Sequence, residues 1–269
     1  MGVRLVVLAG GLAGLFLVFG VIEKLWPSVK GQKRFRRGWK TDIAWFFWNA
    51  TVSRPITAFG VGAAAVLVAV LFFRVDATGT AIRAFVERET WVSGQPMWFQ
   101  VVSLLVLFDL LGYWCHRWFH RRTWLWKYHS VHHSSEELDW LSAVRVHPVN
   151  ELLQRAVQVL PLFALGYQPG LLGGFTVLFT VLAIGFHANV GWDWGPLRYV
   201  ISSPRFHRWH HTSEEEGLDR NFAGLFPWLD LLFGTFHMPR EREPQEFGIV
   251  AARVPTGLWS QLMWPWRRA

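Results

Sequence analysis

Residues 97–120 read MWFQVVSLLVLFDLLGYWCHRWFH. The first part, roughly Met97–Trp114, is almost entirely apolar and is long enough to cross the hydrocarbon layer of a membrane, which is about 30 Å thick. His116 and His120 follow directly, and they share one face of a helix because residues four apart lie one turn apart. This stretch therefore predicts a membrane helix that ends in a pair of potential metal ligands.

Other stretches of the same kind lie on both sides of it. Val3–Ile22 and Pro55–Phe73 each have the length and composition of a membrane helix. Val149–His187 is long enough for two passes, but Pro161 and Pro169 interrupt it, and its first half carries several polar side chains, so it either crosses twice or re-enters. We expect an all-α, multi-pass transmembrane bundle of about four membrane segments.

The composition agrees with one membrane-embedded unit. Hydrophobic residues make up 52% of the 269 and charged residues only 17%, against about 25% in soluble domains. We expect N-terminal membrane helices with a basic loop in residues 1–95, a catalytic domain in 96–240 and a C-terminal cytoplasmic tail in 241–269. Residues 3–22 are apolar for too long to be a cleaved signal peptide, and they predict a first transmembrane helix.

The net charge is +8, and the charged residues lie in the loops between the apolar stretches. This distribution is typical of loops that set membrane topology and does not indicate nucleic-acid binding. Residues 23–54 hold eight Lys and Arg against two acids, whereas residues 75–96 hold two against three. Cytoplasmic loops are rich in Lys and Arg, so we expect residues 23–54, 115–148 and 188–269 on the cytoplasmic side. The single cysteine, Cys115, excludes an intramolecular disulfide and any cysteine-based metal cluster.

Eight of the 11 histidines fall into three tight clusters: HRWFH at 116–120, HSVHH at 129–133 and HRWHH at 207–211. A single HxxxH is often two interfacial histidines, but two HxxHH groups and one HxxxH beside apolar segments are hard to explain by packing. Eight imidazoles exceed the coordination of one ion, so their number predicts two metal ions.

Several kinds of metal site are excluded by what is missing. The HExxH motif of zinc peptidases is absent, and so is the Glu plus Glu-x-x-His set of soluble di-iron bundles. A histidine-rich, carboxylate-poor dinuclear site favours iron and oxygen chemistry. Two alternatives stay open: a membrane haem protein with bis-histidine ligation, used for electron transfer, and a metal transporter.

The sequence resembles the fatty acid hydroxylase/sterol desaturase superfamily of integral membrane di-iron enzymes. The resemblance rests on motifs across about residues 100–240: DLLGYWCHRWFH (Asp109–His120), WKYHSVHHS (Trp126–Ser134), RVHP (Arg145–Pro148), FHANV (Phe186–Val190), FHRWHH (Phe206–His211) and NFAGLFPWLDLLFGT (Asn221–Thr235). The combination of these motifs is specific, although no single one is.

The resemblance implies a set of ligands and a reaction. The ligands fall on His116, His120, His129, His132, His133, His207, His210 and His211, which are also the residues that carry catalysis, and His187 joins them as a further metal ligand. His147 and His237 are expected outside this set. Asp109 is a candidate to orient a ligand histidine, and the alternative, a polar contact between helices, stays open.

The implied enzyme is an O2-dependent oxidoreductase that holds two non-haem iron ions and hydroxylates or desaturates a lipid C–H bond. No Rossmann fingerprint, CxxC set or fused haem domain is present, so electrons are expected from a separate ferredoxin- or cytochrome-type carrier on the cytoplasmic face. The sequence names neither the lipid nor the choice between hydroxylation and desaturation.

Overall fold

The computed structural model describes residues 2–250 and 253–267, and within these ranges all regular structure is helical. The predicted all-α class is therefore confirmed. The part of the predicted tail at residues 251–252 and 268–269 lies outside the described residues. The helices are α1 (Gly2–Leu25), α2 (Trp39–Trp48), α3 (Arg54–Phe73), α4 (Gly79–Val86), α5 (Met97–Arg121), α6 (Thr123–His133), α7 (Pro148–Leu165), α8 (Pro169–His187), α9 (Pro204–His210), α10 (Trp228–Leu232) and α11 (Leu258–Leu262).

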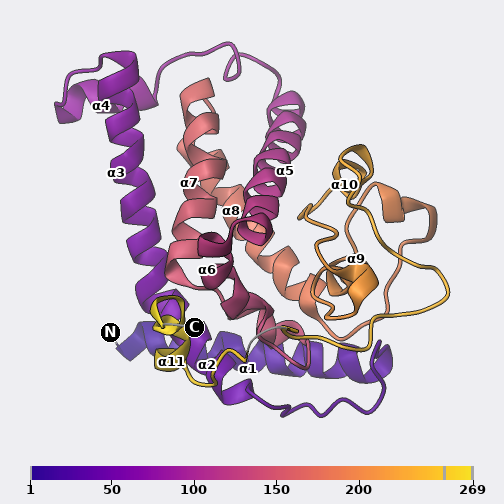
Figure 1. Cartoon of the computed structure of the whole chain (residues 1–269). Coiled ribbons are helices and arrows are strands. Elements are labelled where there is room, and N and C mark those ends of the chain that lie inside the picture. Colours follow the sequence, from indigo (N-terminus) through magenta and orange to yellow (C-terminus); the bar gives the residue numbers. More distant parts are fainter. Residues whose placement is uncertain (1, 251–252, 268–269) are drawn as a thin grey trace.

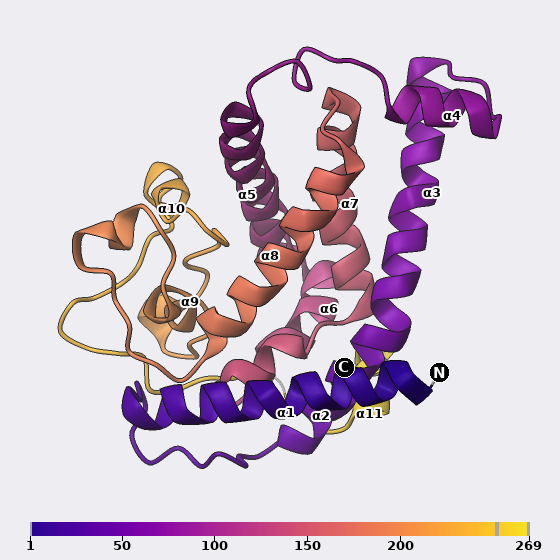
Figure 2. The ribbon, with the colours of Figure 1, turned by 180° about the vertical axis from the view of Figure 1, so that it is seen from behind.

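Four long helices, α3, α5, α7 and α8, have roughly aligned axes, with the chain direction alternating from one to the next, and form the body of the molecule (Figures 1 and 2). α7 packs against both α3 and α5. Phe108 of α5 lies 4.8 Å from Phe179 of α8, centroid to centroid, within the apolar core that joins these helices. α4 lies at one end of the bundle, and α6 and α9 lie toward the other (Figure 1).

Proline and glycine set the limits of these helices. α7 and α8 both begin with proline. Proline has no amide hydrogen, and at the first position of a helix an amide hydrogen would have no partner within the helix, so nothing is lost there. α7 ends at Gly166, whose φ of 97° is the left-handed conformation that terminates helices. α5 has no such break after its apolar part, so one helix carries both the membrane segment and the first two histidines.

Within the described residues, four helical segments are long and apolar enough to cross a membrane: Gly2–Leu25, Trp39–Phe73, Met97–Arg121 and Pro169–His187. Large apolar side chains such as Phe59, Phe72 and Val177 are exposed on them, as expected for surfaces that face lipid. α7 is not among the four, because Glu151, Arg155 and other polar residues interrupt it. It nevertheless lies within the bundle between α3 and α5.

α1 has the apolar length that the sequence predicts, but it lies crosswise to the other long helices at the end of the bundle away from α4 (Figures 1 and 2). One side of it packs on the protein: Phe16 and Phe19 contact Trp140, at 5.0 and 5.4 Å between ring centroids. α1 therefore closes the end of the bundle where the histidines gather.

Candidate metal centre

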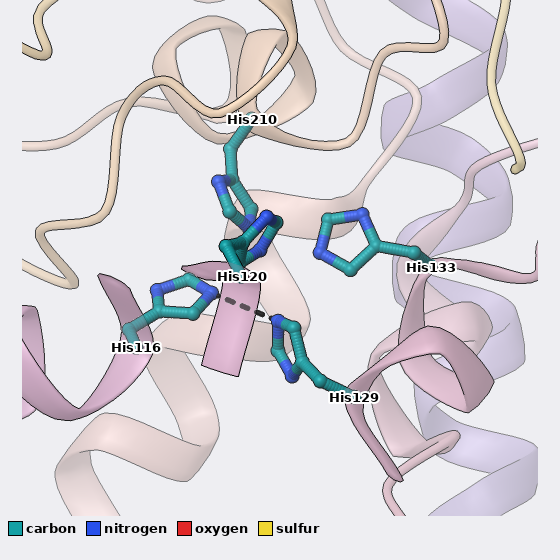
Figure 3. Close-up of side chains that lie close together, drawn as sticks. All are labelled: His116, His120, His129, His133 and His210. Carbon is teal, nitrogen blue, oxygen red and sulfur yellow. Dashed lines mark hydrogen bonds between the residues drawn. The ribbon is translucent and has the colours of Figure 1, made fainter. Parts of the chain in front are cut away.

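Nine histidines converge at this end of the bundle in two groups, and the candidate ligand atoms within each group lie within 4.8 Å of one another. The first group contains His116, His120, His129, His133 and His210, and the second contains His132, His187, His207 and His211. Figure 3 shows the rings of the first group pointing toward a common centre. These nine are the residues that the sequence analysis singled out as metal ligands.

Each HxxHH triplet is divided between the two groups. His129 and His133 belong to the first group and His132 to the second, whereas His207 and His211 belong to the second and His210 to the first. A helix turns about 100° per residue, so the first and last histidines of a triplet differ by about 40°, whereas the middle one is displaced by about 60° to the opposite side of the first. α6 and the short α9 thus each contribute to both groups.

Backbone carbonyls fix the protons of four of these rings on Nδ1. His116 Nδ1 donates to the Phe222 carbonyl at 2.9 Å and His187 Nδ1 to the Ala183 carbonyl at 2.7 Å. His132 Nδ1 and His210 Nδ1 donate in the same way to the carbonyls of Arg145 and Arg220, at 3.2 and 2.8 Å. Because a carbonyl only accepts, each neutral ring has its proton on Nδ1 and a free lone pair on Nε2.

Two side chains accept from the Nδ1 atoms of two more rings and so place their protons on Nδ1 as well. His129 Nδ1 lies 2.8 Å from Asn150 Oδ1, and His120 Nδ1 lies 3.2 Å from Asp219 Oδ1. The sequence analysis did not find Asn150 or Asp219, because neither has a spacing relation to the histidine that it contacts.

The resulting contacts between rings fit bound cations. His116 Nε2 faces His129 Nε2 at 3.0 Å, and His132 Nε2 faces His187 Nε2 at 3.2 Å. With their protons on Nδ1, these pairs would oppose two lone pairs, which is repulsive unless a cation lies beside them. Two nitrogens that bind one ion at about 2.1 Å and at right angles lie about 3.0 Å apart.

Further nitrogens of the first group also need a partner. The Nε2 atoms of His120, His133 and His210 are buried and make no hydrogen bond to any described residue. A buried polar atom without a partner is costly and uncommon in native proteins. The donor set of each group, imidazole nitrogen alone, suits a transition metal such as iron or zinc.

Burial keeps the histidines outside the membrane helices neutral. Desolvation, reinforced by the neighbouring histidines, holds the pKa of His129, His133 and His210 well below its ordinary value. The pKa values of His132, His207 and His211 are lowered in the same way. Neutral imidazole is the form that binds metals, so these rings are ready to act as ligands.

Two buried carboxylates hold the loop that carries the Phe222 carbonyl. Asp109 accepts hydrogen bonds from the backbone amides of residues 224–226, at distances from 2.7 to 3.1 Å. Asp230 accepts from the amides of Phe222 and Ala223, at 2.8 and 2.9 Å. Of the two roles left open for Asp109, direct contact with a histidine is not found: its oxygens bond backbone amides, and it acts on His116 through the loop.

His147 and His237 lie outside both groups. His147 Nε2 bonds the Leu262 carbonyl at 3.1 Å, and its Nδ1 accepts from the Val149 amide at 3.2 Å at the start of α7. The ring of His237 packs edge-on against Trp209, 4.8 Å between centroids. His147 therefore has the role of a helix cap.

A cavity of about 200 Å³ opens beside the two groups. His116, His129, His132, His187 and His207 form part of its wall. α8 contributes mainly apolar residues, and the first half of α7 contributes polar and charged ones. The cavity gives a small molecule access to both histidine groups.

Comparisons with known proteins agree with this geometry. The family model described as fatty acid hydroxylase matches residues 101–235, half of the chain. An ornithine lipid hydroxylase from Rhizobium tropici is 34% identical over 178 residues, which cover 66% of this chain and 54% of that protein. Alkylglycerol monooxygenases from Danio rerio and Homo sapiens are each 31% identical, over 54% and 50% of this chain and 31% and 30% of their own lengths. The chain thus spans about half, or less, of the length of these relatives. No solved structure matches it.

Proposed function

Because this chain belongs to the fatty acid hydroxylase family, we propose that it is a membrane oxygenase that uses O2 and two electrons to hydroxylate or desaturate a C–H bond of a lipid. The chain is an integral membrane protein with several apolar helices, and its relatives include lipid hydroxylases and monooxygenases. The catalytic unit of this proposal is residues 96–240.

The observation that carries the proposal is the pair of histidine groups beside the cavity. Nine imidazoles form two sets of ligand atoms, each within 4.8 Å, and five of the nine rings also face the cavity. Two iron ions held by these sets would supply activation of O2 and removal of hydrogen from an unactivated carbon. The nine histidines are proposed as the ligands, one set for each ion.

The other residues of the site position these rings. The carbonyls of Phe222, Arg145 and Ala183 keep the ring protons on Nδ1, and so keep Nε2 available. Such outer contacts fix ring orientation and raise ligand basicity. The apolar side chains of α8, among them Phe179 and Ile184, give the cavity an apolar wall suited to the hydrocarbon part of a lipid next to the reacting carbon.

We place the active site on the cytoplasmic side, where a separate ferredoxin- or cytochrome-type carrier would deliver electrons. The support is the charge asymmetry of the loops: the basic segment 23–54 is at the histidine end of the bundle, and the less basic segment 75–96 is at the other (Figure 1). Exposed Lys30, Lys33 and Lys40 would attract an acidic carrier.

The geometry speaks against the two alternatives. A bis-histidine haem needs a slot for a flat macrocycle between two rings, whereas five ligand atoms of the first group crowd within 4.8 Å. A transporter needs a polar path along the membrane helices. Pro55–Phe73 offers only the buried Thr57, and the polar side chains of α7 line the cavity beside the histidines.

The proposal is tested by comparing the lipids of cells that express the chain with those of cells that express His132→Ala, His210→Ala or no protein. We expect lipids that have gained one oxygen atom or lost two hydrogens in the first culture only. Purified protein should hold about two iron ions per chain, as the two ligand groups require. Well-folded protein that binds at most one ion of any kind would contradict the dinuclear site.

A further inference from the structure

The end of the cavity formed by the first half of α7 is strongly polar. Glu151, Gln154, Arg155 and Gln158 are spaced three and four residues apart, so they share one face of α7, and all of them line the cavity. Asn49, in the π-helical turn before α3, lines it as well. A cavity built only for a hydrocarbon chain would not carry these charged and amide side chains.

Two acceptors at this end lack a partner. Asn49 is only 5% exposed, and its amide nitrogen donates to the Val144 carbonyl at 2.6 Å, while its Oδ1 bonds no described residue. Glu151 has a side chain 13% exposed, and its Oε2 is likewise without a partner among residues 2–250 and 253–267. Burying such oxygens without donors is unfavourable, so the site calls for a donor from a ligand.

Two arginine side chains near these acceptors can donate hydrogen bonds or attract a negative charge. Arg155 makes one side-chain hydrogen bond within the described part of the chain, to Gln158 Oε1 at 3.3 Å, which leaves most of its guanidinium N–H groups free. Arg54 Nε lies 3.8 Å from Glu151 Oε1, which is too long for a hydrogen bond but close enough for charge attraction. The polar end thus offers both free acceptors and free donors.

Building on the proposed function, we propose that Glu151 and Asn49 bind the polar head of the lipid substrate, and that this head carries a hydrogen-bond donor, a hydroxyl or an ammonium group. Arg155 donates a hydrogen bond to an acceptor atom of the same head group. The oxidised carbon then lies close to the head, because Glu151 and the histidines of both groups line one cavity of about 200 Å³. Typical ligand pockets hold about 300–1,000 Å³, so only the head and the first carbons fit here.

The test uses three probes of one shape: hexadecan-2-ol, hexadecan-2-one and 2-aminohexadecane. The alcohol and the ammonium donate, whereas the ketone only accepts. An equimolar mixture is added to the purified, iron-loaded full chain, and the retained probes are measured by mass spectrometry after desalting. We expect the alcohol or the ammonium to be retained about tenfold over the ketone, the size of one hydrogen bond to a charged group.

Variants of Glu151 identify the acceptor. Glu151→Leu removes it, and we expect the preference for donors to fall below about threefold while the iron content stays unchanged. Glu151→Gln keeps one acceptor oxygen and should fall between. Glu87→Gln, on an exposed residue near α4, is the matched control and should keep the wild-type preference.

Equal retention of alcohol, ammonium and ketone by the wild type would overturn the inference, as would a preference that Glu151→Leu leaves intact. Water on Glu151 and Asn49 would give the first of these results. The proposed function is tested separately by the site of oxidation. Oxidation of a lipid carbon far from the head group would refute the head-group site but support the oxygenase. A preference for donor probes without any oxidation would support the head-group site but count against the oxygenase.

Discussion

Replacing Asn150 with leucine should weaken metal binding without touching a ligand. Asn150 Oδ1 accepts from His129 Nδ1 at 2.8 Å, and a leucine of similar size at this position, which is only 3% exposed, offers the ring no acceptor. The loss leaves a buried donor unsatisfied, at a cost of about 1–3 kcal/mol. The ring can then move its proton to Nε2, the atom that faces His116 Nε2 at 3.0 Å, and an Nε2–H group cannot bind a metal.

The expected result is iron affinity about 10–100-fold lower, the usual effect of losing the partner of a ligand histidine. It is measured by competition with a chelator, with iron per chain determined on the same protein. Asn150→Asp keeps an acceptor oxygen and should retain iron. Gln154→Leu, one turn further along α7 and lining the same cavity, should also retain it. Iron affinity in Asn150→Leu within about threefold of wild type would refute the argument that Asn150 fixes the proton of His129.

Three other predictions follow from the same structure. Removing iron with a chelator should lower the unfolding temperature, because bound metal contributes about 4 kcal/mol at a free concentration of about 1,000 times Kd; an unchanged melting curve would count against a buried site. His132→Ala should reduce oxidation by more than about 100-fold. His147→Ala should keep iron, since both ring nitrogens of His147 already bond the backbone, and loss of iron from this variant would make His147 a ligand. Cysteines placed at Glu87 and Glu215 should react with an impermeant reagent from opposite sides of the membrane, with little background from buried Cys115; labelling from one side only would contradict the topology.

The sequence determined the properties that depend on local chemistry. Hydrophobic length predicted the helices at 55–73 and around 97–114, because an apolar segment in lipid has to satisfy its own backbone. Helical spacing singled out eight of the nine histidines that the structure brings together, since residues three and four apart share a face wherever the helix lies, and the family resemblance added His187. The all-α class expected from these apolar segments likewise agreed with the all-helical fold of the described residues.

Only the tertiary structure decided which histidines act together. His132 and His133 are neighbours in sequence but belong to different groups, and His129 finds His210 across 81 positions of chain. The partners that fix the ring protons, such as Phe222 for His116, come from loops placed by Asp109 and Asp230. Hydrophobicity and helical period act over a few residues, whereas these contacts depend on how separate segments meet, so no spacing rule encodes them.

The same distinction explains α1 and α7. Composition gave each a helix, but it could not show that α1 lies crosswise beneath the bundle or that the polar face of α7 turns inward to the cavity. A helix has the same pattern of side chains in every orientation, and its direction is set by the surfaces against which it packs. For α7 those surfaces are α3 and α5, which place Glu151 and Asn150 beside the metal ligands.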